Sequence, residues 1–224
     1  MPASPELVTA RIAAIQDTIP KSVTLIAVTK QVPAHLMAIA YDMGIRHFGE
    51  SKVQEAAEKQ AQLNGLSGIT WHLIGHLQRN KANKALEQFQ WLHSVDSMKL
   101  ARRLDRLAAP LDHKPKVCLQ VKLRPDPNKY GWSVDELRQD LPQIDQLENL
   151  CVQGLMAIPP YGLSDEDARA IFDDARSLAD EVRQQPLQHV KMQHLSMGMS
   201  DDYLIAMAAG ATMVRLGRTI FGER

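Results

Sequence analysis

Short apolar runs rich in β-branched residues alternate along the chain with longer segments in which apolar and polar residues recur at helical spacing. The runs that predict strands are residues 24–29, 46–48, 70–75, 91–95, 116–122, 151–158, 192–195 and 212–215. The segments that predict helices are residues 6–18, 34–43, 52–63, 81–88, 97–109, 134–146, 165–184 and 201–209. A strand followed by a helix, repeated about eight times, is typical of an α/β protein with a parallel sheet.

Several predicted helices carry recognisable start and stop residues. A serine hydroxyl can accept a hydrogen bond from a free amide at the start of a helix, and four serines stand at predicted starts: Ser97, Ser133, Ser164 and Ser200. Glycine tolerates the left-handed backbone that ends many helices, which indicates helix ends at Gly44 and Gly210. These ends support the division into separate strand–helix units.

The number of units selects among α/β folds. Dividing 224 residues by eight units gives 28 residues per unit, close to the minimum for a strand, two turns and a helix. Eight such units predict a single (β/α)8 TIM barrel with an extra N-terminal helix at residues 6–18. A doubly wound open sheet is the alternative. Because no linker, repeat or low-complexity tract divides the chain, residues 1–224 are predicted to form one domain.

Composition excludes several classes of function. The chain has 26 basic and 26 acidic residues, so it lacks the basic surplus that favours nucleic acid or anionic membranes. No apolar run approaches the roughly 20 residues that cross a bilayer, and the N-terminal residues lack the continuous apolar core of a secretory signal. The two cysteines, Cys118 and Cys151, lie in apolar runs and are expected to be buried thiols of a cytoplasmic protein.

In a barrel, the chemistry is expected at the C-terminal ends of the strands. Lys30 directly follows the apolar run at residues 24–29. A lysine that leaves a buried strand into a barrel mouth is partly desolvated, which favours the neutral amine and Schiff-base formation. On position alone, a lysine whose stem packs at a strand end while its ammonium reaches water is the alternative.

Two glycine-bearing turns near the C-terminus form a second candidate site. Gly198 follows the seventh predicted strand and Gly217 follows the eighth, where barrels often bind phosphate. Glycine lets backbone amides approach an anion closely, and Ser196 and Ser200 can add hydroxyl groups. An amine after the first strand and a phosphate site after the last two predict a phosphorylated aldehyde as ligand. Pyridoxal 5′-phosphate is the candidate cofactor.

Motifs spread over nearly the whole chain point to one family. They are AVTK at residues 27–30, HFGE with VQE at 47–55, WHLIGHLQRNK at 71–81, HSVDS at 93–97, KYG at 129–131, GLMAIPP at 154–160, LSMGMSDD at 195–202 and VRLGRTIFG at 214–222. In these motifs the chain resembles the pyridoxal phosphate homeostasis protein family. The resemblance implies a barrel similar to that of bacterial alanine racemase, with pyridoxal phosphate held as a Schiff base. It also implies a protein without established turnover that is involved in vitamin B6 and amino-acid homeostasis.

The resemblance implies roles for particular residues. It makes Lys30 the Schiff-base lysine, places Arg215 at the pyridine nitrogen, and assigns the phosphate to Ser196 with the amides near Gly217 and Arg218. An arginine keeps its protons, so the ring is a poorer electron sink than with an aspartate partner, which favours binding over catalysis. The full predicted cofactor-binding set is Lys30, Ser51, Met156, Ser196, Gly198, Arg215, Gly217 and Arg218.

Two positions depart from the family's usual residues. Ser51 stands where the family usually has asparagine, so any amide contact that the family makes there is missing from this chain. Arg218 stands where a small residue is common, and its phosphate contact would be made by the backbone. His72 and His76 are four residues apart but fall on a strand and its exit loop, so no zinc site is predicted.

The chain is therefore expected to be a monomeric, non-catalytic binder of pyridoxal phosphate. A weak amino-acid racemase is the alternative, although racemases with this barrel use a second domain and a tyrosine of a partner subunit. Only nine residues follow the eighth predicted strand, up to Arg224. An aldolase-like enzyme that acts on a sugar phosphate through Lys30 and a regulatory module that senses the cofactor are further alternatives. The sequence names no protein partner.

Overall fold

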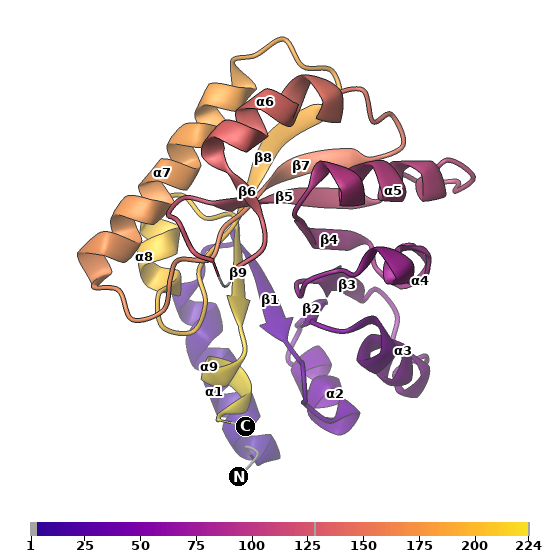
Figure 1. Ribbon diagram of the computed structural model, residues 1–224. Helices are drawn as coiled ribbons and strands as arrows, with labels where there is room; N and C mark the ends of the chain where they lie inside the picture. The colour runs from indigo at the N-terminus through magenta and orange to yellow at the C-terminus, as the bar shows by residue number, and fades with distance from the viewer. Residues whose placement is uncertain (1–3, 128, 224) are drawn as a thin grey trace.

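Parallel strands close into a barrel at the centre of the molecule (Figure 1). The computed structural model describes residues 4–127 and 129–223, so residues 1–3, 128 and 224 of the predicted domain lie outside the described residues. The strands are β1 (Thr24–Val28), β2 (His47–Glu50), β3 (Thr70–Leu73), β4 (Trp91–Val95), β5 (Lys116–Lys122), β6 (Trp132–Ser133), β7 (Cys151–Met156), β8 (Val190–Ser196) and β9 (Met213–Leu216). Hydrogen bonds join them in the order β4-β3-β2-β1-β9-β8-β7-β5-β6, and β4 also pairs with β5. That pairing closes the sheet, which confirms the TIM barrel and excludes the open doubly wound sheet.

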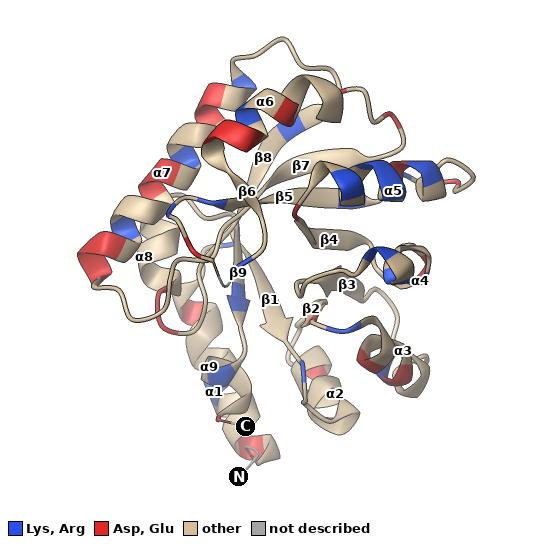
Figure 2. Cartoon of the chain, viewed as in Figure 1, with Lys and Arg blue, Asp and Glu red and all other residues tan. Residues whose placement is uncertain are grey.

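Helices cover the outside of the barrel. They are α1 (Pro5–Thr18), α2 (Ala34–Asp42), α3 (Val53–Gln62), α4 (Ala82–Gln88), α5 (Met98–Ala108), α6 (Val134–Ile144), α7 (Asp165–Arg183), α8 (Tyr203–Ala208) and α9 (Arg218–Phe221), with a 3-10 turn, η1 (Arg79–Lys81). The predicted N-terminal helix is α1, which packs against α2 and α9. Figure 2 shows that charged residues are concentrated on the helices, while the barrel strands contain few of them. Across the described residues, no helix combines the length and the hydrophobicity needed to cross a bilayer.

Two separate apolar regions stabilise the barrel. The larger one lies between the strands and the surrounding helices. The smaller one, which we call the interior cluster, joins five strands inside the barrel and consists of Ile26, Trp91, Cys118, Met156 and Met213. Both cysteines are free thiols, as predicted, but only Cys118 is buried; Cys151 at the start of β7 is half-buried, so its predicted burial is wrong. Burial raises the pKa of Cys118 to about 12, so this thiol is unreactive at neutral pH.

Three of the four serines stand at the predicted helix starts, and two of these make the predicted capping hydrogen bond. The hydroxyl groups of Ser133 and Ser164 accept backbone N–H bonds in the first turns of α6 and α7. Ser97 precedes α5 but makes no capping hydrogen bond. Ser200 is not the residue that precedes α8, and its hydroxyl accepts a hydrogen bond from the amide of Thr219 at 3.3 Å instead. Ser200 is therefore available to the loops at the C-terminal end of the barrel.

Strands end earlier than predicted where the chain leaves the barrel toward the helices. β3 ends at Leu73 and β7 ends at Met156, whereas the sequence predicts strands to residues 75 and 158. Ile74, Gly75 and Ile158 leave the sheet and line a cavity. Each of these apolar runs thus contains the last strand residues of the barrel followed by residues that line the cavity.

Candidate functional site

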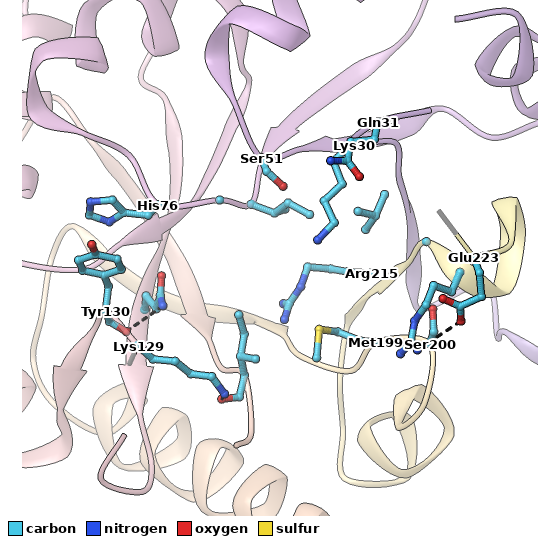
Figure 3. Close-up of a pocket in the computed structure, with 17 residues that line it drawn as sticks. Lys30, Gln31, Ser51, His76, Lys129, Tyr130, Met199, Ser200, Arg215 and Glu223 are labelled. Carbon is cyan, nitrogen blue, oxygen red and sulfur yellow. Dashed lines mark hydrogen bonds and ion pairs between the residues drawn. The ribbon is translucent and has the colours of Figure 1, made fainter. Parts of the chain in front are cut away.

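A cavity of about 620 Å³ opens at the C-terminal end of the barrel (Figure 3). Its walls come from residues on or after seven of the strands: Val28, Lys30, Gln31, Ser51, Ile74, Gly75, His76, Gln120, Lys129, Tyr130, Ile158, Met199, Ser200, Arg215, Gly217, Arg218 and Glu223. This is the end of a barrel where ligands bind. The volume suits a small organic ligand.

Five of the eight residues predicted from the sequence line this cavity, namely Lys30, Ser51, Arg215, Gly217 and Arg218. The structure places the other three, Met156, Ser196 and Gly198, elsewhere. Met156 belongs to the interior cluster. Ser196 is fully buried and hydrogen bonded to Arg215. Gly198 has a φ of +91°, and a Cβ there would lie 2.6 Å from the Cβ of Ala206. These three residues support the wall rather than form its surface.

Lys30 lies in the turn that follows β1. Figure 3 shows its side chain and that of Arg215 pointing into the same cavity. The sequence predicts a partly desolvated lysine at this position, whereas Lys30 is exposed in the structure, so the predicted desolvation is wrong. The position after the first strand agrees with the prediction.

Buried polar groups fix the residues on both sides of Lys30. The ammonium group of Lys59 donates hydrogen bonds to the carbonyl oxygen of Thr29 at 2.5 Å and to Oε1 of Glu50 at 2.8 Å. The backbone amide of Gln31 donates to Oε1 of Glu55 at 2.5 Å, and Glu55 also pairs with Lys59 at 2.6 Å. Burial raises the pKa of Glu50, and the hydrogen bond from Lys59 opposes that rise. The backbone that carries the lysine is therefore tied to β2 and α3.

Arg215 on β9 presents a buried guanidinium to the cavity. Its Nη1 atom donates to the carbonyl oxygen of Ser196 at 2.6 Å and to Oγ of Ser196 at 2.7 Å, while Nη2 donates to the carbonyl oxygen of Ala157 at 3.1 Å. A guanidinium has five N–H bonds, so two remain, and neither has a protein acceptor among the described residues. Burial lowers the pKa of Arg215 to about 10, which still leaves it charged at neutral pH.

The turns after β8 and β9 form the part of the cavity that suits a phosphate. Within the described chain, the backbone N–H groups of Gly217 and Arg218 donate to no protein acceptor. Ser200 lies beside them and is joined to this turn through the amide of Thr219. The guanidinium of Arg218 pairs with Asp201, so its side chain is directed to another partner while its amide stays free. Two free donors and a hydroxyl group can hold a small anion.

An aromatic pair forms the opposite wall. The ring of Tyr130 is stacked on that of His76 with centroids 3.6 Å apart, and Nδ1 of His76 lies 2.9 Å from Oδ2 of Asp96. Lys129 donates to the carbonyl oxygens of Ile158 at 3.2 Å and Pro159 at 2.5 Å, which ties this loop to the end of β7. The sequence did not assign Tyr130 or Lys129 to the site. Their only signal was the KYG motif at residues 129–131.

The groups that meet in the cavity fit one class of ligand. A primary amine, a guanidinium with unused N–H bonds and a pair of free amides suit a molecule with an aldehyde, a ring acceptor and a phosphate group. Among the described residues, no group of three or more His, Cys, Asp or Glu side chains is placed to hold a metal ion. The donor set thus favours an organic phosphate.

Known proteins share this sequence pattern and fold. The family model described as alanine racemase, N-terminal domain, matches residues 5–224. A Synechocystis protein named pyridoxal phosphate homeostasis protein is 48% identical over 207 residues, which cover 92% of this chain and 94% of the relative. PipY of Synechococcus elongatus, solved with PLP bound, is 50% identical with a TM-score of 0.92 and covers 96% of this chain and 100% of its own. Alanine racemase of Clostridium difficile has a TM-score of 0.78 at 14% identity, covering 98% of this chain and 60% of its own. The last likeness confirms the expected barrel fold and extends no further than the fold.

Proposed function

Because the chain belongs to the pyridoxal phosphate homeostasis protein family, we propose that it binds pyridoxal 5′-phosphate in the cavity above the barrel. The observation that carries this proposal is that Lys30, Arg215 and the free amides of Gly217 and Arg218 line one cavity. The bound PLP in PipY, half of whose residues are identical, supports the same ligand for this chain.

We assign the covalent contact to Lys30. Its Nζ is a primary amine at the cavity wall, and a primary amine joins an aldehyde carbon as a Schiff base with loss of one water molecule. When bound, the cofactor supplies that aldehyde and a ring that withdraws electrons from the carbon it holds. The buried contact of Thr29 with Lys59 and the exposed hydrogen bond from Gln31 to Glu55 hold the lysine backbone in place, while the flexible side chain reaches the ligand.

We assign Arg215 to the pyridine ring of the cofactor, with the guanidinium group next to the ring nitrogen. Its unused N–H bonds can donate to an unprotonated ring nitrogen, and the guanidinium has no lone pair with which to accept a proton. Its pKa of about 10 keeps the group charged at neutral pH, so it gives up no proton there. An unprotonated ring is a weak electron sink, and this favours a binder over an enzyme.

The phosphate group is assigned to Ser200 and the amides of Gly217 and Arg218. Ser200 lines the cavity next to these amides, whereas Ser196 is buried behind Arg215. In this proposal Ser196 acts on the cofactor only through Arg215. Ser51 lines the wall near Gly75 and is left as a weaker contact than the asparagine usual in the family.

The biological role is proposed as non-catalytic handling of the cofactor in vitamin B6 and amino-acid homeostasis. We further propose that residues 1–224 form one domain that acts as a cytoplasmic monomer. An amino-acid racemase is the alternative, and the match of residues 5–224 to the family model described as alanine racemase, N-terminal domain, is the observation that favours it. Incubation with each L-amino acid and an assay for the D-isomer separates the two. Sustained turnover would overturn the non-catalytic role.

Titration with pyridoxal 5′-phosphate tests the binding proposal. The wild-type chain is expected to take up one equivalent and to develop the visible absorbance of a lysine-bound cofactor. Lys30→Ala is expected to lose this absorbance, and Lys21→Ala, which changes an exposed lysine in the turn before β1, is expected to retain it. Equal spectra for the two variants would remove Lys30 from its assigned role.

A further inference from the structure

Three imidazole rings form a hydrogen-bonded chain inside the barrel that ends at Arg215. Nδ1 of His47 lies 2.9 Å from Nε2 of His72, and Nδ1 of His72 lies 2.9 Å from Nε2 of His93. Nδ1 of His93 then lies 2.8 Å from Oγ of Ser196, which accepts a hydrogen bond from Arg215. We call these four groups, His47, His72, His93 and Ser196, the interior chain.

The interior chain crosses the barrel from one wall to the other. His47, His72 and His93 belong to the neighbouring strands β2, β3 and β4, whereas Ser196 ends β8 on the far side. His72, His93 and Ser196 are fully buried, and His47 is half-buried. Polar groups at this depth are costly unless each hydrogen has an acceptor, so the directions of these hydrogen bonds are constrained.

Arg215 sets the direction at one end. A guanidinium can only donate, so Oγ of Ser196 is the acceptor in their contact. The serine hydroxyl has one hydrogen of its own, and Nδ1 of His93 is the remaining partner that the described residues offer it. Nδ1 of His93 must therefore be the unprotonated acceptor.

The unprotonated Nδ1 of His93 fixes the direction of the two hydrogen bonds between the imidazole rings. A neutral His93 with a bare Nδ1 carries its hydrogen on Nε2, and it donates this hydrogen to Nδ1 of His72. His72 in turn carries its hydrogen on Nε2 and donates it to Nδ1 of His47. The opposite direction would leave the hydroxyl hydrogen of Ser196 buried without an acceptor.

Surrounding charges keep these rings neutral. Burial and the charge of Arg215 lower the pKa of His93 to about 3, with a smaller effect from His194 on β8. Burial also lowers the pKa of His72 well below its usual value, and Lys116 on β5 acts in the same direction. A proton added to the rings of His72 or His93 would place a positive charge in a region of low dielectric constant near other cations, which is unfavourable.

We propose that the interior chain positions Arg215. In this proposal His93 accepts the hydroxyl hydrogen of Ser196, which directs that hydrogen away from the guanidinium group. The Oγ atom of Ser196 is then available to accept a hydrogen bond from Arg215. The two unused N–H bonds of Arg215 are then held toward the cavity, where they meet an uncharged ring nitrogen. This last step rests on the proposed function. The direction of the interior chain does not, because it follows from the protein's own donors and acceptors.

Nitrogen-15 NMR of the imidazole rings, recorded without cofactor, tests the interior chain directly. His72 and His93 are expected as neutral rings protonated on Nε2, and His93 is expected to stay neutral between about pH 5 and pH 8 because its pKa is lowered to about 3. A proton on Nδ1 of His93, or a charged His93 within that range, would overturn the proposal. This measurement needs no substitution, so it decides the matter even if variants fold poorly.

Two substitutions of His93 test the effect on Arg215. The amide of His93→Gln can accept from Ser196 with its oxygen and donate to His72 with its nitrogen, which reproduces the ring, whereas His93→Phe can do neither. Exchange of the Arg215 guanidinium hydrogens with water is expected to accelerate about tenfold in His93→Phe, as for the loss of one hydrogen bond to a charged group. In His93→Gln it is expected to stay near the wild-type rate. Equal acceleration in both variants, or none in either, would contradict a positioning role.

A cofactor titration separates this inference from the proposed function. Pyridoxal 5′-phosphate affinity is expected to fall in His93→Phe and to recover in His93→Gln, while His35→Phe, an exposed change on α2, leaves it unaltered. If wild type binds no cofactor yet shows the expected tautomers, the proposed function fails and the interior chain stands. If wild type binds cofactor and both His93 variants bind it equally well, the positioning role fails and the proposed function stands.

Discussion

The ammonium group of Lys59 donates a hydrogen bond to the carbonyl oxygen of Thr29 at 2.5 Å, one residue before the lysine that lines the cavity. Lys59 also pairs with the fully buried Glu50 at 2.8 Å, so α3, β2 and the turn after β1 meet at one buried cation. Removal of one member of a buried ion pair leaves the other charge without a partner, which is more costly than the pair is stabilising. The position of Lys30 therefore depends on a residue that does not touch the ligand.

Lys59→Met is expected to lower the free energy of unfolding by about 3–5 kcal/mol, because the buried Glu50 loses its cationic partner and the carbonyl group of Thr29 loses the donor that Lys59 supplies. Urea denaturation measures the change. Lys84→Met, at an exposed position on α4, is the matched control and is expected to change stability by less than about 0.5 kcal/mol. Equal changes in the free energy of unfolding for the two substitutions would show that the buried contacts of Lys59 do not stabilise the fold.

Asp145 connects the end of α6 to the start of β8. Its carboxylate accepts backbone hydrogen bonds from Gln188 at 3.0 Å, His189 at 2.7 Å and Val190 at 3.1 Å. Burial alone would raise the pKa of Asp145, but the three amides outweigh it, so the pKa lies below its usual value of 3.8. The charged form is thus favoured by the folded state.

Asp145→Asn is expected to lose about 1–3 kcal/mol of stability at neutral pH, since amides bind a carboxylate more strongly than a neutral amide oxygen. A carboxyl group whose pKa is lowered by folding stabilises above its unfolded pKa and stops doing so as the pH falls through the folded one. The difference between wild type and Asp145→Asn should therefore be constant above about pH 4 and shrink below it, as followed by denaturation at several pH values. Asp135→Asn, with 85% of its side chain exposed, is the control. A difference that does not vary with pH would contradict the assigned role of the charge.

Gly75 lies where two segments of the cavity wall approach closely. A Cβ at this residue would lie 2.3 Å from the carbonyl oxygen of Ser51 and 2.7 Å from its Cα, and both are backbone atoms that cannot easily move. Gly75→Ala is expected to cost about 1–3 kcal/mol of stability and to weaken cofactor binding, since both residues line the cavity. Gly65→Ala, where no atom lies within 4 Å of the added Cβ, is the control. Comparable stability of the two variants in urea would contradict the close approach.

Ser200 and Ser196 are expected to differ in how their loss affects the ligand. Ser200→Ala should weaken pyridoxal 5′-phosphate binding by about 0.5–1.5 kcal/mol, or somewhat more for a charged partner, and leave binding of phosphate-free pyridoxal unchanged. Ser196→Ala should weaken binding of both ligands and also lower stability, because it removes the hydroxyl group that is one of the three acceptors of Arg215 among the described residues and the partner of His93. Affinities for the two ligands measure this. A Ser196→Ala variant that loses affinity for the phosphorylated ligand alone would return the phosphate to Ser196.

The fold was predictable because most strands of this parallel barrel contain apolar runs, which are typical of strands buried on both faces. β8 is an exception, since the exposed Lys191 and Gln193 alternate with buried residues along it. The strand ends were less predictable. Ile74 and Ile158 are as apolar as the strand residues before them, yet they line the cavity and make no barrel rung. Hydrophobicity alone does not separate a residue that packs in a barrel from one that packs against a ligand.

The site was predictable where position along a strand sufficed. Lys30 follows β1 and Arg215 lies on β9, so both reach the cavity by topology. Ser200 suits both a helix start and a hydroxyl contact to a ligand, because both uses favour serine in a turn, and the sequence does not distinguish them. The contact of Lys129 with the carbonyl oxygen of Pro159 joins residues 30 positions apart across two loops, and no local pattern in the sequence indicates it.

Lys30 is proposed to be the residue that holds pyridoxal 5′-phosphate covalently. Borohydride reduction of the loaded protein fixes the cofactor on its lysine, and digestion followed by peptide mass spectrometry locates it. We expect one modified peptide in the wild-type digest, the one that contains Lys30, and no modified peptide in the digest of Lys30→Ala. Modification at another lysine in the wild-type chain, with Lys30 unmodified, would contradict it.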